Sequence, residues 1–538
     1  MKLKRIAGIS LISMLVLSAS SCGAKLKGSD TTKESSIAIA SSSSLESSST
    51  KSSSSISRAT SSSSAKSSST ISSKEATSQA SSSVASSSAT ASSAAASSAT
   101  SSSKASQTAQ ASSSVASSSL ISSSASSSAA PSIEESTIAD LDSYVTSFMT
   151  STTSYKPSWN QEGFKDRWNY IDGVFLTSIM NLYKSTNESK YLDFVKTFVN
   201  YYIDSDGNFV KPSGSDDSGY NSGELDSVCE SRILFDLYKY TGDSRYQTAI
   251  ETTYTELNKV TVTTNGYNYS HKNSYVNQIW LDGMYMYVPF LIQYANYKND
   301  STLKANIYNH LYNSYKYIRD NMFDENKKLY YHGHDTTKSI FWANTETGNS
   351  ASFWLRSNGW LLVSMADCLD YLEDSDLKTL LTSMLEEALN GILDYQDSET
   401  KMFYQLVDQG NKTFTVPKSY LKKLGNSAYK VDGSYVDADI ANYLESSGSA
   451  MISYACAKAS IHLNNSSYKD KAIDIFNGIY SNKFNNNSLS DICITAGLGP
   501  ESNTTRDGSA YYYLAEPVGS DDAKGTGPFI MAYVALTK

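Results

Sequence analysis

Aromatic residues are confined to one part of this chain. All 61 Phe, Trp and Tyr residues lie in the last 402 of its 538 positions, and residues 1–136 contain none. Between Ser41 and Ala130, 48 of 90 residues are Ser, and Ala and Thr fill most of the rest. A segment of this composition buries too little apolar surface to offset the entropy lost on ordering. We therefore predict a disordered Ser/Ala-rich linker at residues 23–136 and a folded body at residues 137–538.

The net charge divides at the same place. Residues 1–136 carry 11 Lys and Arg against 6 Asp and Glu, whereas the rest of the chain carries 34 against 48. An acidic body has no basic field to displace counterions from phosphates, so nucleic acid is not expected as a partner. A small anionic ligand remains compatible with this charge, because a few local cations suffice to bind one.

The first 22 residues have the pattern of an export signal. A basic start at residues 2–5 precedes an apolar run over residues 6–17 and small residues that end at Cys22. The apolar run is too short to span a bilayer as a permanent helix. Small residues directly before a Cys resemble a bacterial lipoprotein cleavage site. This resemblance implies a lipid attached at Cys22 and a chain anchored at the extracellular face of the membrane. An ordinary signal cleaved elsewhere, giving a secreted protein, is the alternative.

Four further Cys lie in the body, and none forms a C-x-x-C pair: Cys229, Cys368, Cys456 and Cys493. Three of them occur in apolar helical patterns, which is typical of small buried hydrophobic residues. Disulfide pairing in an exported protein is the alternative. The spacing does not suit a zinc site, and we expect no metal.

The body is predicted to consist of helical pairs. Apolar residues recur at helical spacing, and an apolar helix alternates with an amphipathic one. Five pairs share a short polar connector in which Asp, Asn or Ser can accept hydrogen bonds from the next helix: residues 186–191, 241–246, 298–303, 373–377 and 464–468. The C-terminal segment 527–536 is expected to supply a sixth, degenerate unit.

This alternation suits a toroid with buried inner helices and half-exposed outer helices. An open superhelical solenoid is the alternative. The long loops rich in Gly, Tyr and Trp argue against it, because they are typical of one rim of a closed barrel that carries a site.

Two carboxylates stand at the starts of apolar helices, Asp226 and Asp282. Equivalent ends of successive inner helices lie on one rim, so these side chains are expected to converge. Glycoside hydrolysis uses a pair of this kind, with one group protonated and the other charged. Two independent helix-terminal carboxylates are the simpler interpretation.

Side chains typical of sugar sites follow in the sequence. Trp280 is of a sugar-stacking type, and the donors His271, Lys272 and Gln278 precede it. His332 and His334 have a spacing that zinc ligands can have, but no third ligand is near, so hydrogen bonding to a sugar is favoured. Trp354 beside Arg356 suits a ligand with an apolar face and a carboxylate. For Trp360 we expect core packing. The chain has no Gly-rich phosphate loop and no G-x-S-x-G motif, which excludes nucleotide-binding and serine-hydrolase chemistry.

The run from residue 271 to 286 resembles the H-K-x-x-Y-P-x-Q-x-W-L-D-G-L-Y-M segment of unsaturated rhamnogalacturonyl hydrolases, glycoside hydrolase family 105. It is similar, more distantly, to the unsaturated glucuronyl hydrolases of family 88. The resemblance covers about residues 160–538. Further motifs match in chain order: Leu225-Asp226, Tyr331-His332-Gly333, Trp354 with Arg356, Gly359-Trp360, residues 442–447, 496–499, 513–517 and 522–525.

The resemblance implies an all-α fold, the (α/α)6 barrel of six helical hairpins, here preceded by the disordered linker. It also implies an enzyme without cofactor that removes a 4,5-unsaturated uronic acid, here expected to be galacturonyl, from oligosaccharides that a lyase has produced. Asp282 would protonate C4 and then activate water, while Asp226 would hold ring hydroxyls and favour the protonated form of Asp282. His271, Lys272, His332, Trp354 and Arg356 would shape the uronate subsite.

The chain departs from the family pattern at three positions and contains one extra segment. Val276 replaces a usual Pro, His334 a frequent Trp and Leu355 a usual Gly, while residues 411–439 are additional, polar and Lys-rich. The uronate and aglycone therefore stay open, and a glucuronyl hydrolase acting on ulvan or glycosaminoglycan products is an alternative. A non-catalytic glycan-capture lipoprotein and a glycosidase or lyase acting on saturated chains are the others.

Overall fold

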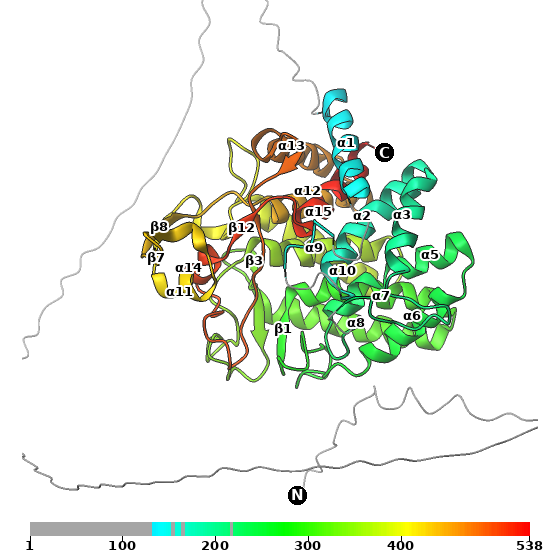
Figure 1. The fold of residues 1–538 in the computed structure, drawn as a ribbon. Helices are drawn as coiled ribbons and strands as arrows, with labels where there is room; N and C mark the ends of the chain where they lie inside the picture. Colours follow the sequence, from blue (N-terminus) through cyan, green and yellow to red (C-terminus); the bar gives the residue numbers. More distant parts are fainter. Residues whose placement is uncertain (1–131, 152–156, 163–166, 216–218, 538) are drawn as a thin grey trace, which may run out of the picture. The chain divides into compact units, whose positions relative to one another are not determined.

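The structure, a computed structural model, describes residues 132–151, 157–162, 167–215 and 219–537 (Figure 1). The predicted signal peptide, Cys22 and the Ser/Ala-rich linker up to residue 131 lie outside the described residues, so they remain predictions. In the described part of the chain, no helix combines the length and the apolar character needed to cross a membrane.

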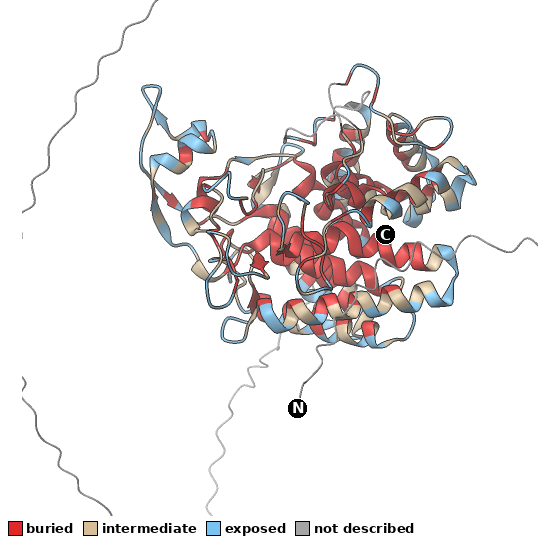
Figure 2. Ribbon diagram, turned by 90° about the horizontal axis from the view of Figure 1, so that it is seen from below, coloured by how far each residue is buried: buried red, intermediate tan, exposed pale blue. Residues whose placement is uncertain are grey.

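Helices dominate the described body and form two concentric layers. The inner layer consists of α2 (Tyr170–Thr186), α4 (Asp226–Glu230) with α5 (Ile233–Thr241), α7 (Leu281–Lys298), α9 (Leu355–Leu369), α12 (Ser446–His462) and α15 (Ala523–Thr537). The outer layer consists of α1 (Glu135–Ser151), α3 (Ser189–Val199), α6 (Arg245–Leu257), α8 (Ser301–Met322), α10 (Asp376–Leu393) and α13 (Ser467–Lys483). Most inner helices are largely buried, although the end of α5 is exposed, and the outer helices expose one side (Figure 2).

The inner helices close into a ring. Each packs against the next in chain order, and α15 packs against both α12 and α2. This closure confirms the predicted (α/α)6 barrel and rules out the open solenoid. The sixth pair joins opposite ends of the body, because α15 packs against α1, and the Tyr533 hydroxyl donates to Oδ1 of Asp142 at 2.7 Å. The sequence indicated only the C-terminal half of this pair, since its two helices lie almost 400 residues apart.

Polar side chains cap the starts of α8, α10 and α6 where the connectors predicted them, whereas α3 has no side-chain cap at Glu188. Asp300 accepts from the backbone N–H groups of Thr302 and Leu303, and Ser375 accepts from that of Lys378. Asp243 likewise accepts from the backbone N–H of Arg245 at 3.0 Å. These bonds satisfy N–H groups that have no partner within the helix, and so they mark where these three outer helices start.

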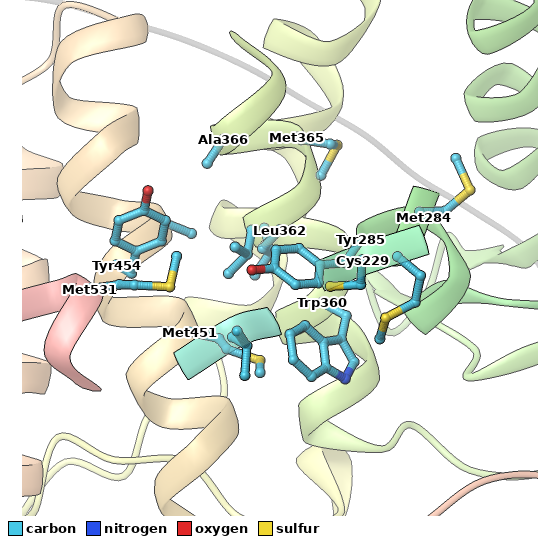
Figure 3. Close-up of a cluster of buried hydrophobic side chains, with 14 of the residues drawn as sticks. Cys229, Met284, Tyr285, Trp360, Leu362, Met365, Ala366, Met451, Tyr454 and Met531 are labelled. Carbon is cyan, nitrogen blue, oxygen red and sulfur yellow. The ribbon is translucent and has the colours of Figure 1, made fainter. Parts of the chain in front are cut away.

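Large side chains fill the centre of the barrel. Figure 3 shows Cys229, Tyr285, Trp360, Met451 and Met531 pointing into the same space from α4, α7, α9, α12 and α15. The rings of Tyr285 and Trp360 stack with their centroids 4.7 Å apart, which confirms the core role expected for Trp360. All four Cys of the body are buried and unpaired, as the first of the two interpretations predicted.

Short antiparallel strands and small helices lie between the helical pairs. The strand pairs are β1 (Gln278–Trp280) with β4 (Gly333–Asp335), β2 (Phe323–Asp324) with β3 (Leu329–Tyr330), β5 (Thr413–Val416) with β8 (Ala438–Ala441), β6 (Lys430–Val431) with β7 (Ser434–Tyr435), β9 (Phe484–Asn485) with β10 (Ser488–Leu489), and β11 (Ile492–Cys493) with β12 (Val518–Gly519). The small helices are η2 (Val407–Gln409), α11 (Lys418–Lys423), η3 (Ser427–Tyr429) and α14 (Ala510–Ala515).

Two of these strand pairs lie in segments that the sequence analysis singled out. In the first, β1 leads directly into α7, and its pairing with β4 places Trp280 opposite Gly333. The backbone N–H of Leu281 then donates to the carbonyl of His332 at 3.0 Å, which ties the start of α7 to the residue before β4. The second, β5 with β8, belongs to the extra segment 411–439, whose helix α11 packs against α14 (left edge of Figure 1).

Candidate active site

Asp226 and Asp282 lie on one cavity at one end of the barrel. Asp226 is the first residue of α4, and Asp282 is the second residue of α7, the inner helix that packs against α4. The cavity has a volume of about 120 Å³. Its lining comes from four parts of the chain: Glu162, Tyr170, Asp226, His271, Lys272, Tyr275, Trp280, Asp282, Met286, Thr495, Ala496 and Arg506.

Lys272 and His271 hold Asp226 in its charged form. Nζ of Lys272 lies 2.6 Å from Oδ2 of Asp226, and Nε2 of His271 lies 3.2 Å from Oδ1. Burial by itself raises the pKa of Asp226, but Lys272 and then His271 outweigh it and hold the pKa well below its usual range. Lys272 also contacts Glu224 at 3.1 Å, and its pKa is raised because these two carboxylates outweigh its own burial.

Backbone contacts bring Asp226, His271 and Lys272 together. The segments at Glu224 and Lys272 form a short antiparallel bridge, and the N–H of Leu225 donates to the carbonyl of His271 at 3.1 Å. These contacts bring the residues just before α4 against those just before β1. The cluster therefore depends on two loops that meet only in the folded protein.

Asp282 has a different neighbour, the buried imidazole of His332. Nε2 of His332 lies 3.0 Å from Oδ2 of Asp282, although neither atom has an aligned hydrogen-bond partner among the described residues. Burial lowers the pKa of His332, and the Asp282 charge only partly opposes this, so the ring is neutral at neutral pH. Nδ1 of His332 lies 2.6 Å from the hydroxyl of Tyr513. Because Oδ2 of Asp282 is enclosed against His332, Oδ1 is the oxygen through which Asp282 reaches the cavity.

An aromatic stack forms one wall. Trp280 stacks on His271 with centroids 4.3 Å apart and on Tyr275 with centroids 5.1 Å apart. Arg506 lies over Trp280, 6.0 Å from its ring centroid, and its Nε donates to the hydroxyl of Tyr512 at 3.4 Å. A Cβ at Gly497 would collide with the guanidinium, so the Gly at this position of the 496–499 motif makes room for Arg506.

Four of the predicted substrate-binding residues do not line this cavity: Gln278, Trp354, Arg356 and the His332 that lies behind Asp282. Gln278 is buried and accepts from the indole N–H of Trp280 at 3.2 Å. Trp354 is buried under the guanidinium of Arg356, 4.6 Å from its ring centroid. Arg356 is only 1% exposed and donates to Ser447 and to the carbonyl of Cys493. A direct contact between these side chains and a substrate remains a prediction.

The three departures from the family pattern also lie away from the cavity lining. His334 is buried between Tyr317 and Asn349, with contacts of 3.0 and 2.8 Å from its two ring nitrogens. Leu355 is buried against the position of Gly448, and Val276 is 54% exposed. In the described part of the chain, no group of three or more His, Cys, Asp or Glu side chains is arranged to hold a metal ion.

Sequence reasoning missed several residues that line the cavity or support it. Tyr170 begins α2, and Glu162 precedes that helix in an irregular segment. Arg506 follows the 496–499 motif in a stretch without regular structure, where no periodicity pointed to it. Tyr513 belonged to a matched motif, but its contact with His332 spans 181 positions and had no local signal.

The amino-acid sequence matches a family model and several known proteins. The family model for Glycosyl Hydrolase Family 88 matches residues 141–419 and 433–538, and the gap falls inside the extra segment 411–439. Protein Atu3128 of Agrobacterium fabrum is 30% identical over 215 residues, which cover 38% of this chain and 80% of that protein. The unsaturated rhamnogalacturonyl hydrolase YesR of Bacillus subtilis is 22% identical over 261 residues, covering 47% of this chain and 67% of YesR.

Solved structures show the same fold. A family 105 glycoside hydrolase of C. acetobutylicum is 28% identical with a TM-score of 0.60, covering 74% of this chain and 98% of that one. A possible family 105 member from Klebsiella pneumoniae is 17% identical with a TM-score of 0.55, covering 75% and 93%, and so shares the barrel. We conclude that this chain is a glycoside hydrolase of the family 88 and 105 group.

Proposed function

We propose that this protein removes a 4,5-unsaturated uronic acid, galacturonyl in the first instance, from the non-reducing end of oligosaccharides that a polysaccharide lyase has produced. The observation that carries the proposal is the unequal environment of two carboxylates on one cavity. Asp226 is held charged by Lys272, while Asp282 faces a neutral His332. Such a difference separates the roles of an acid and a charged partner.

The chemistry follows from the substrate. The C4=C5 bond of an unsaturated uronate is conjugated with its carboxylate and bonded to the ring oxygen, so it accepts a proton at C4. Asp282 gives that proton, and the positive charge that develops at C5 is shared with the ring oxygen. Water adds at C5 while the Asp282 carboxylate takes a proton from it. The resulting hemiketal opens and releases the aglycone sugar.

The remaining side chains bind and orient the ring. The charged Asp226 accepts hydrogen bonds from ring hydroxyls. Lys272 and His271 hold its carboxylate in position. Trp280 offers an aromatic surface at the wall. Arg506 supplies a cation for the substrate carboxylate, a role that the sequence had suggested for Arg356. The small cavity suits one terminal ring, as expected for an enzyme that acts at a chain end.

Ultraviolet absorbance of the conjugated double bond provides the test. Purified protein mixed with unsaturated galacturonyl-rhamnose should bleach the absorbance and release rhamnose, whereas the saturated disaccharide should stay intact. Bleaching only with unsaturated glucuronyl disaccharides would keep the reaction and move the specificity. If no unsaturated disaccharide is consumed while binding is still detected, the capture alternative replaces the proposal.

A further inference from the structure

A second cavity lies on the outer wall of the barrel, between α6, α8 and the loop that leads to β1. It has a volume of about 220 Å³ and shares no lining residue with the catalytic cavity. Its lining contains Tyr, Asn and aliphatic residues and no Asp, Glu, Lys or Arg: Tyr254, Asn258, Gly266, Tyr267, Tyr269, Leu291, Leu303, Asn306, Ile307, Asn309, His310 and Asn313. An uncharged lining is notable on a chain in which 18% of residues are charged.

Three aromatic residues of this cavity are held in place by their backbone or by a neighbouring ring. Tyr267 is 43% exposed, yet its backbone N–H donates to Asn265 and its carbonyl accepts from Ser314, both at 2.7 Å. Tyr254 stacks on Tyr294 with centroids 4.0 Å apart, so that contact fixes the plane of its ring. Tyr269 is buried beside Tyr287. An exposed aromatic ring on an anchored loop is preorganised for stacking, which lowers the entropic cost of binding.

Amide side chains supply the polar groups. Asn306, Asn309 and Asn313 follow one side of α8 at helical spacing, and Asn258 caps the end of α6. Nδ2 of Asn258 donates to the carbonyl of Tyr254 at 2.9 Å, and Nδ2 of Asn313 donates to that of Asn309 at 2.7 Å. These bonds fix the two amide planes and leave Oδ1 of each able to accept a hydrogen bond from a ligand hydroxyl.

The cavity stays uncharged at neutral pH. His310 is the lining residue whose side chain ordinarily titrates near neutral pH, and burial lowers its pKa to about 4. A charged ligand would therefore give up its hydration without gaining an opposite charge. A neutral ligand with hydroxyl groups loses less hydration free energy, because amide groups of the cavity can replace its hydrogen bonds to water.

We propose that this cavity binds one neutral pyranose ring of a saccharide, at a site separate from the catalytic cavity. A pyranose has an apolar C–H face that packs on Tyr267 or Tyr254, and an edge of hydroxyl groups that reaches the Asn side chains. Pockets for drug-sized ligands have volumes of about 300 Å³ or more. This cavity is smaller, so its volume suits one sugar ring. Binding here requires no turnover, and the inference stands or falls independently of the proposed reaction.

Saturation-transfer NMR on the full chain tests this site with the methyl glycosides of L-rhamnose, D-galactose, D-glucose and D-xylose as neutral probes and D-galacturonate as the charged comparison. At least one neutral glycoside should bind, and D-galacturonate should not compete with it. Tyr267→Ala should weaken that binding about tenfold or more, since removing an aromatic anchor from a binding site has effects of this size. Asn313→Ala should weaken it in the same direction.

Tyr240→Ala is the matched control, because Tyr240 is also exposed, at 38%, but lies on α5 outside the cavity. It should leave binding unchanged, and all variants should keep the melting temperature within a few degrees. Absence of binding by every neutral glycoside would overturn the proposal, as would binding that both cavity variants leave unchanged. A dimer that Tyr267→Ala dissociates in sedimentation would overturn it too, because the cavity would then receive a second copy. None of these readouts changes if the enzyme proves inactive on unsaturated substrates.

Discussion

Nε2 of His332 lies 3.0 Å from Oδ2 of Asp282, at the start of the inner helix α7. The imidazole is completely buried and is held on its other side by Tyr513. Burial keeps the ring neutral and raises the pKa of the Tyr513 hydroxyl well above its usual value. The neighbour of Asp282 therefore carries no charge at neutral pH, in contrast to the Lys272 that holds Asp226.

Replacing Asp282 tests its role as the acid. We expect Asp282→Asn to lower kcat at least ~10²-fold, because an amide cannot give a proton to C4, while the barrel stays folded. Loss of absorbance of unsaturated galacturonyl-rhamnose measures the rate, and circular dichroism checks the fold. Asp320→Asn, at a surface carboxylate 52% exposed, is the control and should keep full activity. Near-normal turnover in Asp282→Asn would remove Asp282 from the mechanism.

The cation beside Asp226 should control the acid limb of the pH profile. We expect Lys272→Met to move that limb of kcat/KM to higher pH by about one unit or more, because an opposite charge at this distance lowers a carboxyl pKa by 1–3 units. Activity then requires a higher pH before Asp226 ionises. Lys259→Met, which breaks an exposed pair with Glu256, should leave the limb in place. An acid limb that does not move in Lys272→Met would show that Asp226 does not set it.

Arg506 should contribute to substrate binding more than to the chemical step. We expect Arg506→Gln to raise KM about tenfold or more with a smaller change in kcat, because a contact with the substrate carboxylate is made before and during the reaction. Initial rates over a range of unsaturated disaccharide concentrations separate the two constants. Arg245→Gln, at a surface pair with Asp243, is the control. If KM stays unchanged, the carboxylate is bound elsewhere, and Arg356 becomes the next candidate.

Buried carboxyl groups should make the protein less stable as the pH rises. Burial raises the pKa of Asp172 to about 7, although Trp159, Asn169 and Asn160 donate hydrogen bonds to it. The folded state then binds more protons than the unfolded state, so the free energy of unfolding should fall between about pH 4 and 8.

Asp172→Asn should reduce this fall by about 1–3 kcal/mol, since the amide does not ionise. Denaturant unfolding at pH 5 and pH 8 gives the change in the free energy of unfolding with pH for each protein. Comparing these changes removes the pH-independent cost of altered hydrogen bonds in the variant. Part of the slope should persist, because burial also raises the pKa of Glu516 to about 7. Equal slopes in the two proteins would contradict the shift at Asp172.

Local sequence signals accounted for the parts of the fold that depend on neighbours in the chain. Helical periodicity indicated the alternation of apolar and amphipathic helices, and Asp300 and Ser375 cap their helices as the connectors indicated. The positions of Asp226 and Asp282 at the starts of inner helices followed from the same patterns. Each of these features is set within a few residues, through backbone hydrogen bonds and side-chain burial.

The sequence by itself therefore determined the helical repeats, their caps and the two carboxylates at the inner rim. Tertiary structure decided that α15 pairs with α1, that Arg506 and not Arg356 lines the cavity, and that Tyr513 supports His332. These contacts join residues that are far apart in the chain, through loops without periodic pattern. Ring closure brings such loops together, and no local propensity records which of their side chains will meet.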